Sequence, residues 1–270
     1  MTDLDLFAVG DNCIDRLTGH AQAVLVGGNA VNVAVQGALA GLRTGYAGAV
    51  GPVGEADSQR VRRALTDNGV LVDWLERRDL PTSVTELHVG ADGDRRILRE
   101  DFGACAGWTP PPATLDALKQ ARHVHIGWLD DGGATRRFLV GADVAVSQDV
   151  SVNATSPQNI TVAGLTIAFT SLPEDQEASA QARADALIAA GARAAVVTLG
   201  RLGSLAVTHG TTHRAAAEPV KAIDTTGAGD SYIAGFLAAR LAGASLPACM
   251  DAGHARAAIT CTHPGGFPQA

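Results

Sequence analysis

Short apolar runs alternate with longer runs of helical periodicity along most of the 270-residue chain. Bounded apolar runs of this length are typical of buried strands, and they include LDLFAVG, AVLVGG, TGYAGAVG, HVHIGWL, DVAVSQDVS, LTIAFTS, AAVVTLG and SLAVTHG. Helical spacing marks NAVNVAVQGALAGL, with Asn29 as its expected N-cap, and also EADSQRVRRALTDNG, ATLDALKQA, DQEASAQARADALIAAG, the run after Asp230, and LPACMDAGHARAAITCT. This alternation predicts an α/β fold with a mostly parallel sheet covered by helices on both faces. No linker interrupts it, so one domain over residues 1–270 is expected.

Composition and charge exclude several classes of function. The net charge is −7 and the arginines are scattered, so no nucleic-acid partner is expected. No apolar run reaches the roughly 18 residues that a membrane-spanning helix needs. The N-terminus MTDLDLFAVG resembles a first strand more than a signal peptide. The four cysteines are far apart and form no CxxC pair, which favours reduced thiols in a cytoplasmic protein.

One stretch departs from the α/β alternation. SVTELHVGADGDRRILRED, at residues 83–101, contains two strand-like runs joined around Asp92-Gly93, which is a hairpin signal. Because it stands between βα units, we expect this hairpin to project from the main sheet. It also holds a cluster of arginines, Arg95, Arg96 and Arg99, which could face solvent or an anionic group of a ligand.

The segment KAIDTTGAGD places Gly227, Ala228 and Gly229 directly before an apolar-periodic helix. Free backbone N–H groups at a helix N-terminus attract anions, and glycine allows an anionic group to approach closely. Asp230 would repel a bound phosphate if it were passive, but it fits a base that takes a proton from an attacking hydroxyl. Ordinary helix capping is the alternative interpretation of these four residues. A Walker P-loop and a dinucleotide-binding GxGxxG are both absent from the sequence.

Longer segments give a resemblance to a known family. DTTGAGDSYIAGF, at 224–236, resembles a signature of the ribokinase-like (phosphofructokinase-B type) carbohydrate kinases, and VGGNAVNVAVQGALAGL, at 26–42, resembles their N-terminal signature. GYAGAVGPVGEAD and VVTLGRLGS resemble two further family segments, in the expected order. The resemblance implies a ribokinase-like three-layer α/β/α fold with a small β lid at 83–101, and transfer of the γ-phosphate of ATP to a sugar hydroxyl. GDNCID, at residues 10–15, further resembles members that act on fructosamine-type sugar amines.

The resemblance also implies roles for residues whose segments match. Asp230 would be the catalytic base, beside an anion hole formed by Gly227, Ala228 and Gly229. The implied sugar contacts are Asp11, Asn12, Asp15, Gly28 and Asn32. The implied nucleotide contacts are Thr198, Gly200, Gly203, Thr225 and His254, although His254 is equally interpreted as a packed helix residue.

Metals and partners follow from the same resemblance. Mg²⁺ is expected with ATP, near Glu174 of the SLPE segment, where Ser171 replaces the family's usual asparagine and Glu177 is a competing acid. Asp224 resembles a ligand of the K⁺ site found in some members. The lids of two subunits pair in many relatives, which implies a homodimer.

Other functions remain open at this point. A nucleoside kinase is one alternative, since relatives of this fold accept nucleosides, and a non-catalytic sugar-sensing protein is another. His123 and His125 point to the same face of a strand, but nothing with metal-ligand spacing accompanies them. We therefore expect both histidines to line the core or a crevice.

Overall fold

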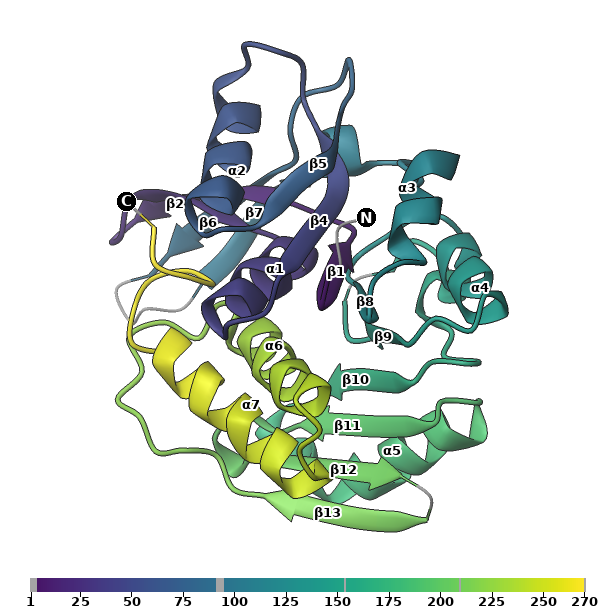
Figure 1. Cartoon of the computed structure of the whole chain (residues 1–270). Coiled ribbons are helices and arrows are strands. Elements are labelled where there is room, and N and C mark those ends of the chain that lie inside the picture. The colour runs from purple at the N-terminus through teal and green to yellow at the C-terminus, as the bar shows by residue number, and fades with distance from the viewer. Residues whose placement is uncertain (1–3, 91–94, 153, 209, 270) are drawn as a thin grey trace.

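The computed structural model describes residues 4–90, 95–152, 154–208 and 210–269. Its centre is a 9-stranded sheet in the order β13-β12-β11-β10-β9-β8-β1-β4-β5 (Figure 1). The strands are β1 (Leu6–Val9), β4 (Thr44–Val50), β5 (Leu71–Arg77), β8 (His123–Ile126), β9 (Val146–Asp149), β10 (Ile167–Ser171), β11 (Ala194–Thr198), β12 (Ser204–Thr208) and β13 (Thr211–Ala215). In this order, neighbouring strands from β5 to β11 pair in parallel. At the other edge of the sheet, β12 pairs antiparallel with both β11 and β13. The expected mostly parallel sheet is confirmed.

Helices cover both faces of this sheet (Figure 1). One face carries α1 (Asn29–Leu39), α2 (Ala56–Asp67), α6 (Ala228–Leu241) and α7 (Leu246–Thr260). The other carries α3 (Pro112–Leu118), α4 (Ala134–Gly141) and α5 (Ala180–Ala189). Within the described ranges, no helix combines the length and the apolar character that a bilayer crossing requires.

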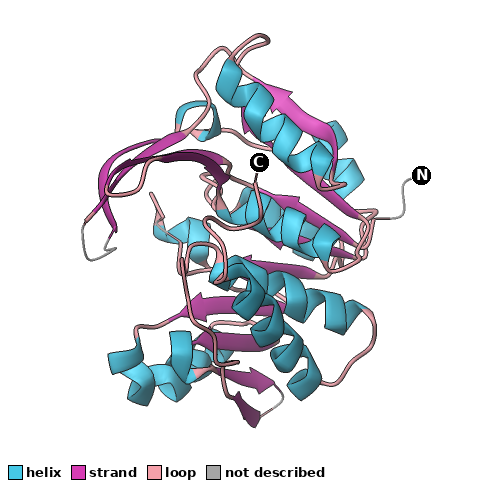
Figure 2. Cartoon of the chain, turned by 90° about the vertical axis from the view of Figure 1, so that its left-hand side faces the viewer, coloured by secondary structure: helices cyan, strands magenta, loops and turns pink. Residues whose placement is uncertain are grey.

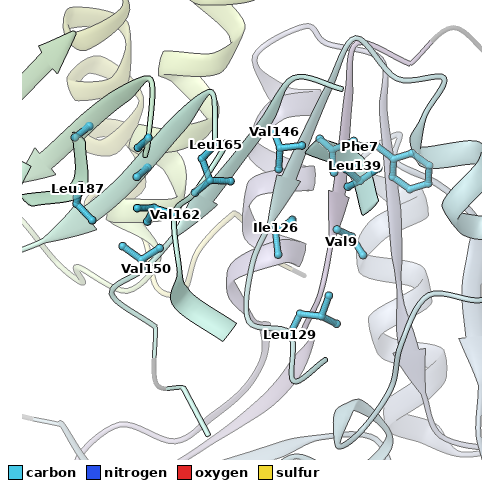
Figure 3. Packing of buried hydrophobic residues seen from close by; sticks show 14 of the residues in the cluster. Phe7, Val9, Ile126, Leu129, Leu139, Val146, Val150, Val162, Leu165 and Leu187 are labelled. Carbon is cyan, nitrogen blue, oxygen red and sulfur yellow. The ribbon is translucent and has the colours of Figure 1, made fainter. Parts of the chain in front are cut away.

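The core explains why the central strand β1 is apolar at every position. In β1, Phe7 and Val9 pack with Leu139 of α4 and Val146 of β9 on one face (Figure 3). Leu6, on the same strand, packs on the opposite face against α1 and α6. A strand buried on both faces gains about 1.5–3 kcal/mol for each large apolar side chain, so the alternation typical of half-exposed strands is lost.

A second, 4-stranded sheet stands apart from the main sheet, in the order β3-β2-β6-β7 (Figure 2). Its strands are β2 (Cys13–Gly19), β3 (Ala23–Gly27), β6 (Val84–Val89) and β7 (Arg95–Asp101). The predicted hairpin is therefore only half of the small sheet, because β2 pairs in parallel with β6 and antiparallel with β3. AVLVGG was expected to continue the main alternation, but it lies in this small sheet. The predicted turn at Asp92-Gly93 lies outside the described residues.

The start of α1 also differs from expectation. Asn29 is the first helical residue and not the N-cap, which is Gly28 with a φ of 103°. A Cβ on Gly28 would lie 2.7 Å from the Cα of Asn12, so the backbone needs glycine both for its dihedral and for this close approach. The shift by one residue frees the Asn29 side chain to point elsewhere.

Candidate active site

Three carboxylates gather where parallel strands end and helices begin. Asp11 follows β1, Asp149 is the last residue of β9, and Asp230 lies in the first turn of α6. All three are half-buried. The carboxyl ends of parallel strands share one edge of a sheet, which is where ligands bind in open α/β folds.

Asp230 is held by two amide side chains of α1. Asn29 Nδ2 donates to its Oδ1 at 2.6 Å, and Asn32 Nδ2 donates to its Oδ2 at 2.7 Å. Burial raises the pKa of Asp230 to about 7, the two amide donors oppose that rise, and the nearby Asp149 and Asp11 add to it. A carboxylate with its pKa near neutrality is suited to accept a proton from a hydroxyl.

Asn29 joins Asp230 to two residues that sequence reasoning did not assign to the site. Its Nδ2 also donates to Asp149 Oδ2 at 3.3 Å, and its Oδ1 lies 3.3 Å from His125 Nε2. Asp149 further accepts from the N–H and hydroxyl of Ser151, and burial raises its pKa. Asp149 could have been assigned to the site from the sequence, because it lies toward the carboxyl end of a predicted strand.

Among the described residues, Asp11 accepts hydrogen bonds from backbone amides. It accepts the N–H groups of Asn29 at 2.9 Å, Ala30 at 3.2 Å and Trp128 at 3.2 Å. Burial raises its pKa to about 6, against the lowering effect of these donors. Asp11 therefore anchors the first turn of α1 to the segment after β8.

The other predicted sugar contacts are spread over the same region. Asn12 is buried and donates to the Tyr46 hydroxyl and the Ala49 carbonyl, while its Oδ1 has no hydrogen-bond partner in the described part of the chain. The buried Asn32 likewise leaves its Oδ1 unpaired within the described ranges. Asp15 comes from β2 of the small sheet, where its carboxylate packs against Gly27.

The predicted anion hole forms the start of α6, which has no side-chain cap. Gly227 has a φ of 72°, and a Cβ there would lie 2.4 Å from the Cα of Gly266, so only glycine fits. The N–H of Ala228 donates to the Thr225 carbonyl at 3.1 Å, which closes a turn and engages one of the three expected donors. Gly229 instead borders a cavity of about 50 Å³.

That cavity brings several predicted nucleotide-side residues near Asp149. Its lining is Asp149, Ser151, Phe169, Thr170, Ser171, Thr198, Gly229 and Ile233. Gly200 and Gly203 form the turn after β11, and the exposed Thr225 precedes α6. His254 is buried in α7, with its Nε2 2.9 Å from Ser204 Oγ, which itself lies 2.9 Å from the Tyr232 hydroxyl. Packing between α6, α7 and β12 thus accounts for His254.

The predicted metal ligands have other partners. Glu174 pairs with Arg201 at 2.6 Å and accepts the Arg201 N–H, while Glu177 lies 3.7 Å from Arg214. Asp224 accepts the N–H groups of Thr226 and Gly265. No cluster of three or more His, Cys, Asp or Glu that could hold a metal occurs in the described ranges. The carboxylate and hydroxyl oxygens around the cavity are nevertheless the donors that suit Mg²⁺ carried by ATP phosphates.

Two of the three clustered arginines and the paired histidines also have definite positions. In β7, Arg96 and Arg99 pair with His88 and Glu86, whereas Glu100 pairs with Thr85, which in turn faces Asp15. Because side chains alternate along a strand, Arg96 and Arg99 lie on the face opposite Asp15. His123 and His125 are buried, as expected, and both hydrogen-bond to Ser147.

Comparison with known proteins decides the family. The model of the pfkB family of carbohydrate kinases matches residues 2–268. The chain belongs to the pfkB family. Its relatives include a fructoselysine 6-kinase of Shigella flexneri, 35% identical over 267 residues that cover 97% of this chain and 99% of that enzyme. A nucleoside kinase of Methanothermobacter thermautotrophicus is 29% identical over 268 residues, covering 92% and 86% of the two chains.

The fold agrees with this pfkB assignment. The structure of Arabidopsis thaliana ribokinase, complexed with ribose and ATP, matches with a TM-score of 0.85 and 22% identity, over 99% of this chain and 96% of that one. The expected ribokinase-like fold, with its large sheet and separate small sheet, is thereby confirmed, as is the carbohydrate kinase family expected from the two signatures.

Proposed function

We propose that this pfkB carbohydrate kinase transfers the γ-phosphate of ATP to a hydroxyl of a fructosamine-type sugar amine. The observation that carries the proposal is the pairing of Asp230, held at both oxygens by Asn29 and Asn32, with the uncapped start of α6. The resemblance to fructoselysine 6-kinase supports the substrate class. The carboxylates of Asp11, Asp149 and Asp230 at the site also suit a substrate that carries a protonated amine.

The residues of the site divide the work of phosphoryl transfer. Asp230 takes the proton of the attacking hydroxyl, and its raised pKa keeps that transfer favourable near neutral pH. The N–H of Gly229 and the positive end of the α6 dipole stabilise the charge of the migrating phosphoryl group. We keep Asn12 and Asn32 as proposed sugar contacts; their Oδ1 atoms are buried and have no hydrogen-bond partner within the described ranges.

The nucleotide side of the site is proposed at the cavity between β9, β10, β11 and α6. Thr198 lines this cavity, Gly200 and Gly203 form the turn that follows it in the chain, and Thr225 precedes α6; we keep all four as the proposed ATP contacts. Mg²⁺ would supply charge neutralisation on the phosphates, with Asp149 better placed beside the cavity than Glu174, whose carboxylate pairs with Arg201. A K⁺ site at Asp224 remains a proposal, tested by comparing turnover in potassium and sodium salts.

A coupled ADP assay over fructosamines, ketoses, ribose and nucleosides tests this function. We expect ADP release with fructosamines and ATP-Mg²⁺, and no turnover in EDTA. Turnover with nucleosides only would favour the nucleoside kinase alternative, which the relative from Methanothermobacter thermautotrophicus keeps open. Thermal stabilisation by a sugar without any ADP release would indicate a sugar-sensing protein.

We further propose a homodimer in which the small sheets of two subunits pack together as lids. A row of apolar residues crosses the small sheet on the Asp15 face: Ala23, Leu17, Leu87 and Ile97. Ile97 is 54% exposed, which favours burial against a partner. An Ile97→Glu variant should turn a dimer into a monomer in light scattering after gel filtration, whereas a wild-type monomer would contradict the proposal.

Single-domain organisation and a cytoplasmic location are the remaining proposals. The first is supported by the match of one family model along nearly the whole chain. The second is supported by the use of ATP and by the free state of Cys13, Cys105, Cys249 and Cys261.

A further inference from the structure

A buried line of hydrogen bonds leads from the interior of the main sheet to Asp230. His123 Nε2 lies 2.8 Å from Ser147 Oγ, and Ser147 Oγ lies 2.9 Å from His125 Nδ1. His125 Nε2 lies 3.3 Å from Asn29 Oδ1, and Asn29 Nδ2 donates to Asp230 at 2.6 Å. His123, His125 and Ser147 are at most 2% exposed.

The two strands that carry this line bring its members together by register. His123 and His125 are two residues apart in β8, so their side chains share one face. Ser147 of β9 is the direct partner of His125 in the parallel pair. That face of the sheet is covered by α1, whose first residue is Asn29.

Only one direction of donation satisfies every member of the line. Asn29 uses its amide nitrogen for the carboxylates of Asp230 and Asp149, so its Oδ1 must accept. His125 must therefore carry its proton on Nε2, and its Nδ1 must accept from the Ser147 hydroxyl. The oxygen of Ser147 is then left to accept from Nε2 of His123. A reversed Asn29 amide would instead point its oxygen at two ionised carboxylates, which have no proton to donate.

We propose that His125 is a positioning residue for phosphoryl transfer, which, locked by Ser147 and His123, fixes the Asn29 amide with its nitrogen toward Asp230 and Asp149. The inference rests on the proposed role of Asp230 as the proton acceptor. It assigns a task to two buried histidines that neither bind a metal cluster nor touch the reacting atoms.

The surroundings of the two imidazoles keep this chain of hydrogen bonds uncharged. Burial lowers the pKa of both imidazoles to about 3, and the neighbouring imidazole and Arg240 add to this for His125 and His123 respectively. The rings are therefore neutral at any pH where Asp230 titrates. The groups that face Asp230 are Asp11 after β1, Asp149 of β9, and the amides of Asn29 and Asn32.

Two substitutions of His125 separate positioning from packing. His125→Phe removes the donor to Asn29, whereas His125→Gln keeps an N–H donor near the position of Nε2. With fructosamine and ATP saturating, we expect kcat of His125→Phe to fall about tenfold to a hundredfold. In its pH–kcat profile, the acid limb, which is the fall in kcat toward low pH, should move up by about one pH unit. The reason is that Asp230 loses the fixed Asn29 donor that lowers its pKa. His125→Gln should restore most of kcat and the wild-type limb.

Leu139→Ala, a buried truncation in α4 on the other face of the sheet, is the matched control for lost packing. It should lower the melting temperature without moving the acid limb. If His125→Phe behaved like Leu139→Ala, or if His125→Gln were as impaired as His125→Phe, His125 would be a packing residue only.

The tautomer gives a readout that does not depend on turnover. Long-range ¹H–¹⁵N NMR of the wild-type protein at neutral pH should show the Nε2–H tautomer for both His123 and His125. An Nδ1–H tautomer at His125 would overturn the inference even in an active kinase. Absence of ADP release from the wild-type protein counts against the proposed function alone, since the tautomer measurement still decides the orientation of the Asn29 amide.

Discussion

Gly229→Ala should make the protein more stable and much less active. Gly229 is the second residue of α6, and its φ lies outside the left-handed region. An ideal Cβ at this position meets no atom within 4 Å. Replacing glycine by alanine in a helix stabilises it by about 0.5–1 kcal/mol. For a chain of this size that corresponds to a rise in melting temperature of roughly 1–4 °C.

The empty space beside Gly229 is the reason for the expected loss of activity. It belongs to the cavity that Asp149 and Thr198 also line, where we place the phosphoryl group. A methyl group there would hold phosphoryl oxygens away from the Gly229 N–H. Loss of one such donor typically costs about 10²–10³ in kcat. Differential scanning fluorimetry and the coupled ADP assay measure the two effects on the same preparation.

Gly141→Ala provides the matched control for this prediction. Gly141 ends α4, has no left-handed φ, and also has open space around its Cβ, far along the chain from α6. It should gain stability of the same order and keep the wild-type kcat. If Gly229→Ala also kept the wild-type kcat, the phosphoryl group would not approach this amide, and the assignment of the α6 N-terminus as the anion hole would be wrong.

Three further predictions concern the charge of Asp230. Since its pKa is raised to about 7, kcat/KM of the wild-type enzyme should fall as the pH drops through about 7, and a profile flat to pH 5 would contradict the assignment of the base. Asp230→Asn should lower kcat by about 10²–10⁴ while calorimetry still detects ATP binding. It should also raise the melting temperature at alkaline pH: the folded pKa exceeds the unfolded 3.8, so the stability held by the neutral carboxyl is lost as the pH rises through about 7. In Gly266→Ala, the new Cβ would lie 2.3 Å from Asn32 Oδ1 and should displace the Asn32 amide, whose Nδ2 donates to Asp230. The pH at which activity falls on the acid side should then rise; an unchanged profile would show that Asn32 does not tune Asp230.

The main sheet could be predicted from sequence because its strands are buried on both faces. The strand β1, LFAV, has no polar position to confuse its assignment. The strand β2 has no such pattern: Ile14 and Leu17 are buried, while Asp15 and Arg16 between them are half-exposed. Its partner β3 follows it directly along the chain, whereas its other partner β6 comes only after α1, β4, α2 and β5, so pairing and not local pattern defines the small sheet.

The candidate site likewise has a part that could be predicted from the sequence and a part that could not. Asp230 and the glycines before it are contiguous, so a short segment is enough to indicate an anion site beside a base. The partners of Asp230 come from α1, β8 and β9, and their roles depend on register between strands. Asn29 was expected to cap α1. Nothing in its own segment shows that its side chain instead donates a hydrogen bond to a carboxylate about 200 residues later, that of Asp230.

The C-terminal segment explains how two distant signatures are held as one site. Asp224 accepts the N–H of Gly265, and Gln36 of α1 donates to the Gly266 carbonyl at 2.6 Å. Gln269 then bonds to both the N–H and the carbonyl of Val26 in β3, so the chain end runs from α7 to the small sheet (Figure 1). The C-terminal segment thus contacts the residues just before α6, the second half of α1 and the small sheet.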